Sequence, residues 1–169
     1  MTLAAGSIRI EPLESHHDRA AFACGKEVLD RYIRQQASQD VRRGVASVFV
    51  AVMVGEPSRI LGFFTLSAAS VIPTDLPREV AKRMPRHPIP AALIGRLAVD
   101  LNFARQGLGG VLLADAIQKA AVAAETVAMS AVVVDPLDDD ARAFYTAFGF
   151  RSLEGPQPRM FLSMPRPNS

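Results

Sequence analysis

Apolar residues recur along this chain with two periods, which divide it into expected helices and strands. Ile8 and Ile10 alternate with Arg9 and Glu11, which predicts an edge strand over residues 7–12. Runs of β-branched, aromatic and other apolar residues predict further strands over 45–54, 60–71, 93–99, 127–134 and 159–164. Apolar positions three and four residues apart predict helices, which fall at 14–22, 26–43, 78–84, 108–124 and 139–147.

The order of these elements predicts the fold class. Residues 45–54 and 60–71 flank a Gly-Glu-Pro-Ser turn and should pair as an antiparallel hairpin. The later strands are joined through helices, which is typical of parallel pairing. We therefore expect an α/β fold with a mixed central sheet flanked by helices, in a single domain that spans residues 1–169.

A glycine turn between the strand at 93–99 and the helix at 108–124 is the first candidate site. Gly107, Gly109 and Gly110 lie where the helix begins, so main-chain N–H groups and the helix dipole could hold a phosphate. A P-loop would need a lysine and a hydroxyl residue here, and a dinucleotide fold would need its glycines in the first strand–helix unit. The alternative is a tight turn with no ligand.

Composition narrows the class of protein. Hydrophobic residues make up 49% of the chain and charged residues 21%, as in globular proteins. No apolar run is long enough to span a membrane, and no secretion signal is evident. A lone Cys24 fits a reducing compartment, so we expect a cytoplasmic protein. The three histidines (His16, His17 and His87) and Cys24 have no metal-ligand spacing, so we predict no metal centre and histidines at the surface or in loops.

The kind of basic residue is more informative than the net charge of +2. Arginine outnumbers lysine by 16 to 3, which suits bidentate phosphate contacts, although a GC-rich genome would have the same effect. Arg83, Arg86 and Arg96 lie in a basic stretch that could receive a nucleic-acid backbone or be a solvated loop. Arg96 interrupts an apolar strand, so it is either paired within the fold or reaches RNA phosphate.

Three segments together resemble the GCN5-related N-acetyltransferase (GNAT) family. They are Gly-Arg-Leu-Ala-Val-Asp at 95–100, Gln-Gly-Leu-Gly at 106–109, and Phe-Tyr-Thr-Ala-Phe-Gly-Phe at 144–150. The resemblance covers almost the whole chain and implies an acetyl-CoA-dependent N-acetyltransferase.

A narrower resemblance is to the acetyltransferase toxins of bacterial toxin–antitoxin modules. It rests on Phe-Ala-Cys-Gly-Lys-Glu-Val-Leu-Asp-Arg-Tyr-Ile at 22–33, on 88–100 and on 138–145. It implies acetylation of the amino group of aminoacyl-tRNA, which blocks translation, with a ribbon-helix-helix antitoxin as partner and a homodimer as the usual assembly. The alternatives are a GNAT enzyme for a small amine or a protein N-terminus, and a catalytically inactive binding protein.

The resemblance also implies residue roles. Main-chain groups at Leu97, Ala98 and Val99 would hold the thioester and pantetheine arm. The pyrophosphate would lie in the loop formed by Ala104, Arg105, Gln106, Gly107, Leu108, Gly109 and Gly110, and the last helix would contribute Asp138, Ala141 and Phe144.

The catalytic prediction rests on Tyr145, which the resemblance makes the general acid that protonates the leaving thiolate. Tyr145 could instead be a packing residue beside Phe144 and Phe148. The chain departs from the family where Ala104 replaces a Gln or Arg and Asp138 an Asn. No glutamate lies on the strand at 93–99, so no side-chain base is evident.

Overall fold

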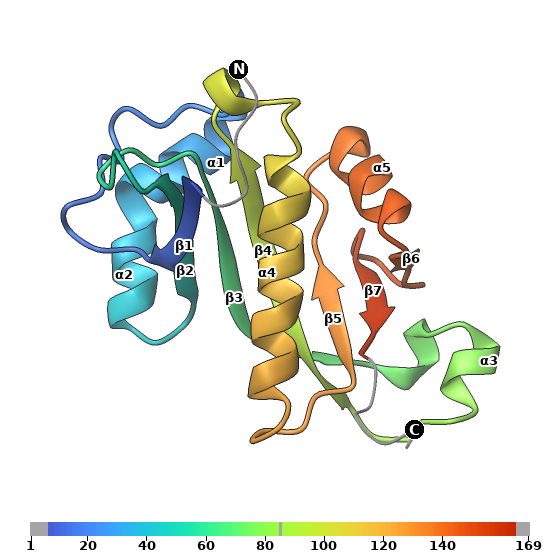
Figure 1. Ribbon diagram of the computed structural model, residues 1–169. Coiled ribbons are helices and arrows are strands. Elements are labelled where there is room, and N and C mark those ends of the chain that lie inside the picture. The colour runs from blue at the N-terminus through green and yellow to red at the C-terminus, as the bar shows by residue number, and fades with distance from the viewer. Residues whose placement is uncertain (1–6, 85, 165–169) are drawn as a thin grey trace. The chain divides into compact units, whose positions relative to one another are not determined.

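The computed structural model describes residues 7–84 and 86–164. Within them, seven strands form one mixed sheet in the order β1-β2-β3-β4-β5-β7-β6 (Figure 1). The strands are β1 (Ile8–Pro12), β2 (Ser47–Met53), β3 (Gly62–Val71), β4 (Ile89–Val99), β5 (Ala131–Val134), β6 (Arg151–Ser152) and β7 (Met160–Ser163). The α-helices are α1 (Glu27–Arg31), α2 (Ala37–Arg42), α3 (Arg78–Ala81), α4 (Leu108–Ala123) and α5 (Asp139–Ala147).

Strand pairing confirms the predicted α/β fold class. Strands β1, β2 and β3 form an antiparallel meander, so the hairpin prediction is confirmed. Strand β4 pairs with β5 in parallel through 91–94 and 131–134, and helix α4 connects them. Strand β7 pairs antiparallel with both β5 and β6.

The chain divides into two compact units. Unit 1 holds residues 7–66 and 96–116 of the described chain, and unit 2 holds 67–95 and 117–164. The expectation of one domain over 1–169 stays a prediction.

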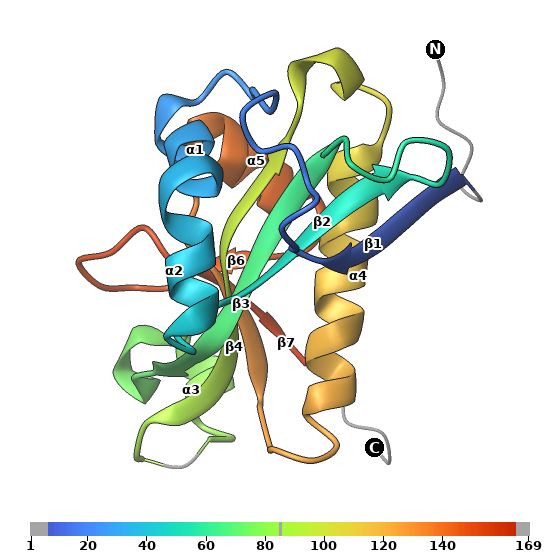
Figure 2. The ribbon, with the colours of Figure 1, turned by 90° about the vertical axis from the view of Figure 1, so that its left-hand side faces the viewer.

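Unit 1 is built around a cluster of aromatic side chains. Phe22 meets Phe63 edge to face at 5.4 Å between ring centroids, and Tyr32 stacks on Phe63 at 6.2 Å. These rings and the aliphatic residues around them form the core beneath α1 and α2, on one face of β2 and β3 (Figure 2). On the other face, the first turns of α4 approach β3 so closely that only Gly62 fits there.

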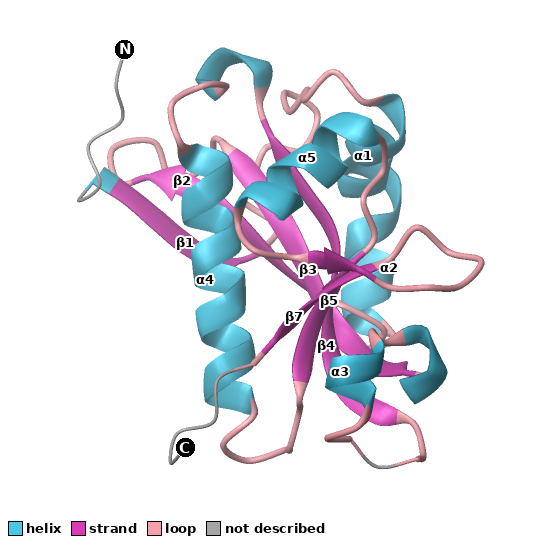
Figure 3. Cartoon of the chain, turned by 90° about the vertical axis from the view of Figure 1, so that its right-hand side faces the viewer, coloured by secondary structure: helices cyan, strands magenta, loops and turns pink. Residues whose placement is uncertain are grey.

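Unit 2 has its own apolar core. Ile89 and Ala91 on β4 pack with Ala131 and Val133 on β5 and with Phe161 on β7. Helix α5 lies at the carboxyl end of β5, and α3 lies near its opposite end (Figure 3).

The helix predicted over Glu14–Phe22 is wrong, because main-chain donors that a helix would use internally bond elsewhere. The Asp18 N–H donates to the Ser58 carbonyl at 2.7 Å, and the Ala21 N–H donates to Asp18 Oδ1 at 3.2 Å. Such local bonds stabilise turns in competition with helix. His17 lies in this loop, which agrees with the expectation of histidines at the surface or in loops, and it is buried, at 4% exposed.

The other predicted elements are confirmed with shifted bounds. The helix expected over 26–43 contains a π-helical segment, Tyr32–Gln36, between α1 and α2. Strand β4 begins at Ile89, before the predicted start, and β5 begins only at Ala131. Among the described residues, no helix is both long and apolar enough to cross a membrane.

Candidate functional site

A buried aspartate fixes the path of the chain from β4 into the glycine loop. Asp100 is 3% exposed, and its carboxylate accepts bonds from the main-chain N–H groups of Asn102 at 2.9 Å and Ala23 at 3.2 Å. A short 3₁₀ turn, Leu101–Phe103, follows. Asp100 therefore ties the start of the loop to the segment that precedes α1.

The loop itself has the backbone of an anion site. Arg105 and Gly107 both lie in the left-handed region, with φ of 63° and 81°. The first bond of α4 runs from the Val111 N–H to the Gly107 carbonyl, so the N–H groups of residues 108–110 lie ahead of the helical ladder. A Cβ on Gly107 would meet nothing within 4 Å, so the space beside it is open. This arrangement can hold a phosphate.

Gln106 adds an unpaired polar atom to the same loop. Its Oε1 is buried and, among the described residues, has no hydrogen-bond partner. A buried acceptor without a donor costs free energy, so its presence fits a ligand that carries N–H or O–H groups.

The end of β4 turns two of its residues away from β3. The Arg96 N–H donates to Thr65 Oγ1 and the Asp100 N–H donates to the Leu61 carbonyl, so even-numbered residues face β3 here. Main-chain N–H and C=O groups point to alternate sides along a strand, so those of Leu97 and Val99 point away from β3. The Ala98 carbonyl, by contrast, lies against Gly62 on β3.

Pairing of β4 with β5 is limited to a short segment in unit 2. The Pro90 carbonyl accepts a bond from the Ser130 N–H, and the paired residues of β4 run from Ala91 to Ile94. Pairing with β5 ends at Ile94, so Leu97 and Val99 lie beyond the ladder.

Arg96 has a partner within unit 1, a contact that sequence reasoning left open. Its guanidinium carbon lies 3.7 Å from the centroid of the Tyr32 ring. The Tyr32 hydroxyl in turn donates to Asp40 Oδ2 at 2.8 Å. Burial raises the pKa of the Tyr32 phenol above its usual range, and the Asp40 carboxylate adds to that rise. Tyr32 is a core residue, at 4% exposed.

In unit 2, Tyr145 on α5 is buried among rings. It is 5% exposed and contacts Phe144 and Phe150, at 5.2 and 5.5 Å between centroids. Burial raises the pKa of the Tyr145 phenol well above its usual range, and the Asp135 carboxylate adds to the rise. Asp135 is held by a bidentate bond from Arg159 at 2.8 and 3.1 Å. Tyr145 therefore keeps its proton at neutral pH.

The start of α5 is capped by Asp138. Its Oδ1 accepts from the Ala141 N–H at 2.9 Å, the capping role expected for a carboxylate there. Phe144 is half-buried and packs on Phe148 as well as on Tyr145.

The basic residues at 83 and 86 lie in unit 2, away from regular structure. Arg86 is exposed, and Arg83 lines a cavity of about 490 Å³ together with residues that include Val80 and Phe161. Arg151 also lines it and pairs with Glu79 at 2.7 Å.

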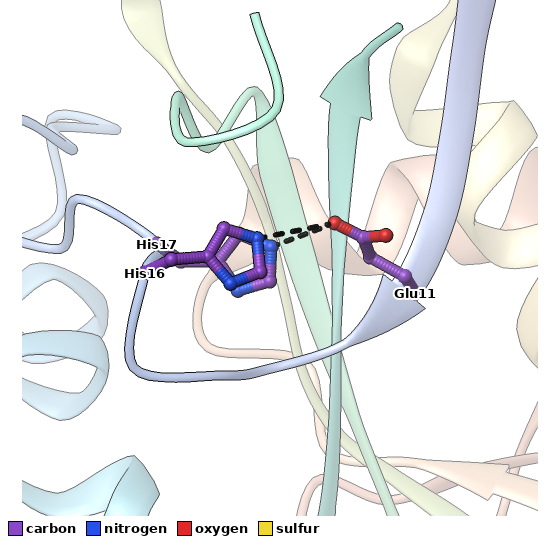
Figure 4. Close-up of side chains that lie close together, drawn as sticks. All are labelled: Glu11, His16 and His17. Atoms are coloured by element: carbon purple, nitrogen blue, oxygen red, sulfur yellow. Dashed lines mark hydrogen bonds and ion pairs between the residues drawn. The ribbon is translucent and has the colours of Figure 1, made fainter.

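One cluster was missed from the sequence. Glu11, His16 and His17 bring three ligand atoms within 4.8 Å of one another (Figure 4). Histidine and cysteine spacing alone could not reveal it, because Glu11 belongs to β1 and reaches the histidines only after the chain turns.

The predicted residues thus gather in two groups. Unit 1 assembles Arg96 to Gly110, including Leu97, Ala98, Val99 and the loop from Ala104 onward. Unit 2 holds Tyr145, Asp138, Ala141, Phe144, Arg83 and Arg86.

Known proteins resemble this chain over most of its length. Residues 13–150 match the model of the acetyltransferase (GNAT) family. A tRNA-acetylating toxin of Mycobacterium tuberculosis (strain ATCC 25618 / H37Rv) is 39% identical over 133 residues, which are 79% of this chain and 78% of the relative. The probable toxin TacT of Sinorhizobium fredii (strain NBRC 101917 / NGR234) is 32% identical over 162 residues, 90% of this chain and 89% of the relative.

Solved structures agree with these relatives. AtaT complexed with acetyl-methionyl-tRNAfMet has a TM-score of 0.86 at 26% identity, covering 92% of this chain and 94% of AtaT. AtaTR bound with AcCoA has a TM-score of 0.82 at 27% identity, covering 94% and 95%. With 138 of its residues matched by the family model, from 13 to 150, the chain belongs to the GNAT acetyltransferase family.

Proposed function

We propose that this chain transfers an acetyl group from acetyl-CoA to the amino group of an aminoacyl-tRNA and thereby acts as a toxin that stops translation. The observation that carries the proposal is the 39% identity to a tRNA-acetylating toxin over 79% of the chain. The structural likeness to AtaT in complex with acetyl-methionyl-tRNAfMet supports the same substrate class.

The glycine loop fits the donor. Acetyl-CoA supplies an acetyl group activated as a thioester. The N–H groups of residues 108–110 and the open side of Gly107 would hold its pyrophosphate, with Arg105 as the nearest cation. The buried Oε1 of Gln106 would accept from one of its N–H or O–H groups. The likeness to AtaTR bound with AcCoA supports acetyl-CoA as the donor.

The main chain of β4 would orient the thioester end of acetyl-CoA. Leu97 and Val99 direct their N–H and C=O groups away from β3, beyond the last β5 pair. Such groups can bond an extended arm in the manner of an added strand. Ala98 would contribute through packing, since its carbonyl faces Gly62.

Tyr145 would supply the proton that the leaving thiolate needs. Its raised pKa, caused by burial and by Asp135, keeps the phenol protonated at neutral pH. Burial would also raise the pKa of the CoA thiol as it forms. The difference in pKa between the Tyr145 phenol and this thiol would therefore be smaller than in water. Phe144 and Phe150 hold the ring in place.

The acceptor amine needs little help to lose its proton. An α-amino group has a pKa of about 8, well below the value of about 10.4 for lysine. Water can therefore serve as the base, which agrees with the absence of glutamate from Ile89–Val99. Arg96 would contact a phosphate near the charged end of the tRNA, and Arg83 and Arg86 would contact phosphates farther along.

The remaining features of the proposal follow from the toxin assignment. We expect a cytoplasmic homodimer of single-domain chains, neutralised by a ribbon-helix-helix antitoxin. The likeness to the AtaT Y144F mutant toxin bound to the C-terminus of the antitoxin AtaR, with a TM-score of 0.79 at 25% identity, supports an antitoxin partner.

The decisive experiment is acetyl transfer from radiolabelled acetyl-CoA to bulk charged tRNA. We expect label on charged tRNA and none on uncharged tRNA, and mild alkali should release it as an N-acetyl amino acid. Tyr145→Phe should lower the rate by about 10²–10⁴. Acetyl-CoA binding without label on charged tRNA would contradict the proposal and favour a small amine or protein N-terminus as acceptor.

A further inference from the structure

Three side chains from β1 and the loop after it converge on one point in unit 1 (Figure 4). Glu11 Oε1 lies 2.8 Å from His17 Nε2 and 3.8 Å from His16 Nε2. The two imidazole rings lie 4.1 Å apart between centroids, at an interplanar angle of 38°. Neither the proposed reaction nor its substrates use this cluster.

The cluster has the ligand types and spacing of a zinc centre. Two imidazole nitrogens and one carboxylate oxygen are an established zinc set with an open fourth position. With metal–ligand bonds of about 2.0–2.1 Å, tetrahedral ligands lie about 3.3 Å from one another. The two Glu11–histidine distances, 2.8 and 3.8 Å, lie within about 0.5 Å of that value. The two histidine nitrogens lie within 4.8 Å of each other and would have to adopt the same separation.

From this juxtaposition we propose that Glu11, His16 and His17 form a binding site for Zn²⁺ or a similar divalent transition metal. The site does not depend on the proposed function.

The surroundings orient the ligands. Arg9 Nε donates to Glu11 Oε2 at 3.0 Å, which leaves Oε1 facing the histidines. Glu14 Oε2 lies 3.6 Å from His16 Nδ1 and, after a shift of about 0.5–0.8 Å, would accept a hydrogen bond from the second nitrogen of a metal-bound His16. The His16 side chain is 47% exposed and that of His17 is 0% exposed, so a metal would enter beside His16.

Metal binding requires one rearrangement, which gives the proposal a specific signature. His17 Nδ1 accepts from the Glu14 N–H, so in the metal-free ring the proton is on Nε2 and is donated to Glu11. A metal on Nε2 displaces that proton to solvent, and Nδ1 takes one up, so the ring stays neutral. The protonated Nδ1 can no longer accept, and the bond from Glu14 breaks.

The first test is a titration of the untagged protein with Zn²⁺, followed by calorimetry, and with Co²⁺, followed by its visible absorption. We expect one equivalent to bind and to raise the melting temperature, with a tetrahedral Co²⁺ spectrum. His16→Asn should weaken binding at least about tenfold. His87→Asn is the matched control, because His87 is an exposed histidine outside the cluster. Equal binding by both variants, or no binding, overturns the proposal.

The second test reads the His17 tautomer by ¹H–¹⁵N NMR of the imidazole nitrogens. It needs no variant, so a folding defect cannot confuse it. We expect the Nε2–H form without metal, the Nδ1–H form with one equivalent of Zn²⁺, and a shifted Glu14 amide. An unchanged tautomer at saturating Zn²⁺ would show that the cluster is a hydrogen-bonded turn only.

Discussion

The guanidinium of Arg96 lies over the ring of Tyr32, with its carbon 3.7 Å from the ring centroid. Arg96 stands on β4 directly before Leu97, and Tyr32 opens the π-helical segment between α1 and α2. The bond from the Tyr32 hydroxyl to Asp40 fixes the ring. A guanidinium held by an aromatic face keeps its N–H groups available for an anion. The contact also links the helical segment between α1 and α2 to the end of β4, next to the glycine loop.

Two replacements of Arg96 should separate the effect of its charge on tRNA binding from the effect of its planar group on stability. Arg96→Gln removes one phosphate contact, so the slope of log K against log salt for charged tRNA should fall by about 0.7–1. Arg96→Lys should retain most of that slope but lose the planar stack, which lowers the free energy of unfolding by about 0.5–1 kcal/mol.

Arg59 provides the matched control for this measurement. Its guanidinium lies 4.8 Å from the centroid of Phe103, so Arg59→Gln also removes a cation–π contact and one charge. Filter binding of charged tRNA across a salt series compares the variants. An equal loss of slope in Arg59→Gln would mean that only net charge matters.

Gly107→Ala should weaken acetyl-CoA binding through two effects that a control can separate. The left-handed backbone at φ 81° costs an alanine about 1–2 kcal/mol, and the added methyl group intrudes on the open side of the loop. Gly44 has φ 68° and likewise nothing within 4 Å of a Cβ, so Gly44→Ala carries only the backbone cost.

Calorimetric titration with acetyl-CoA and chemical denaturation provide the two readouts. Both variants should lose similar stability, and only Gly107→Ala should lose affinity. Unchanged affinity in Gly107→Ala would remove the loop from the donor site.

The confirmed elements are those in which local pattern and tertiary packing agree. The repeat over 108–124 and the glycine before it predicted α4 and its loop, and the apolar spacing over 139–147 predicted α5. The helix predicted over 14–22 is wrong because the Asp18 N–H bonds to the Ser58 carbonyl, a contact that depends on three-dimensional position, and the Asp18 side chain accepts from the Ala21 N–H.

The parts of the site that were not predicted depend on long-range contacts. The Arg96–Tyr32 stack joins residues far apart in sequence, and the pattern at 93–99 left Arg96 with two alternatives. The approach of Glu11 to the two histidines depends on a turn that was predicted as helix. Strand β4 begins at Ile89, before the predicted start at residue 93. It can include Pro90 because an exposed proline whose carbonyl is bonded is compatible with a strand.

Both tyrosines of the chain should resist ionisation near pH 10. Burial raises the pKa of Tyr32 and of Tyr145 above the usual value of about 10, and the sequence contains two tyrosines and no tryptophan. A raised pKa in the folded state stabilises the fold below pH 10, and that stability is lost as the pH rises toward the folded-state pKa.

A spectrophotometric titration at 295 nm tests this, because absorbance there reports tyrosinate. We expect little signal up to pH 10 and then a steep rise that coincides with unfolding in circular dichroism. A reversible step of one tyrosine near pH 10 in folded protein would contradict the burial of one of them, and Tyr145→Phe would identify which.

Gly62 at the start of β3 should tolerate no side chain, because both of its near neighbours are constrained. An added Cβ would lie 2.8 Å from the Ala98 carbonyl oxygen and 2.8 Å from Leu112 Cδ1. The carbonyl belongs to β4 and Leu112 is 0% exposed, so relief would require moving a strand or repacking the core. Gly62→Ala should therefore lower the free energy of unfolding by about 1–3 kcal/mol.

The same substitution should also weaken acetyl-CoA binding, because Ala98 lies between Leu97 and Val99. Gly55→Ala, at a position with nothing within 4 Å, is the control and should change neither quantity measurably. Denaturant unfolding of Gly62→Ala that matches the control would show that β3 and β4 are not in close contact at this point.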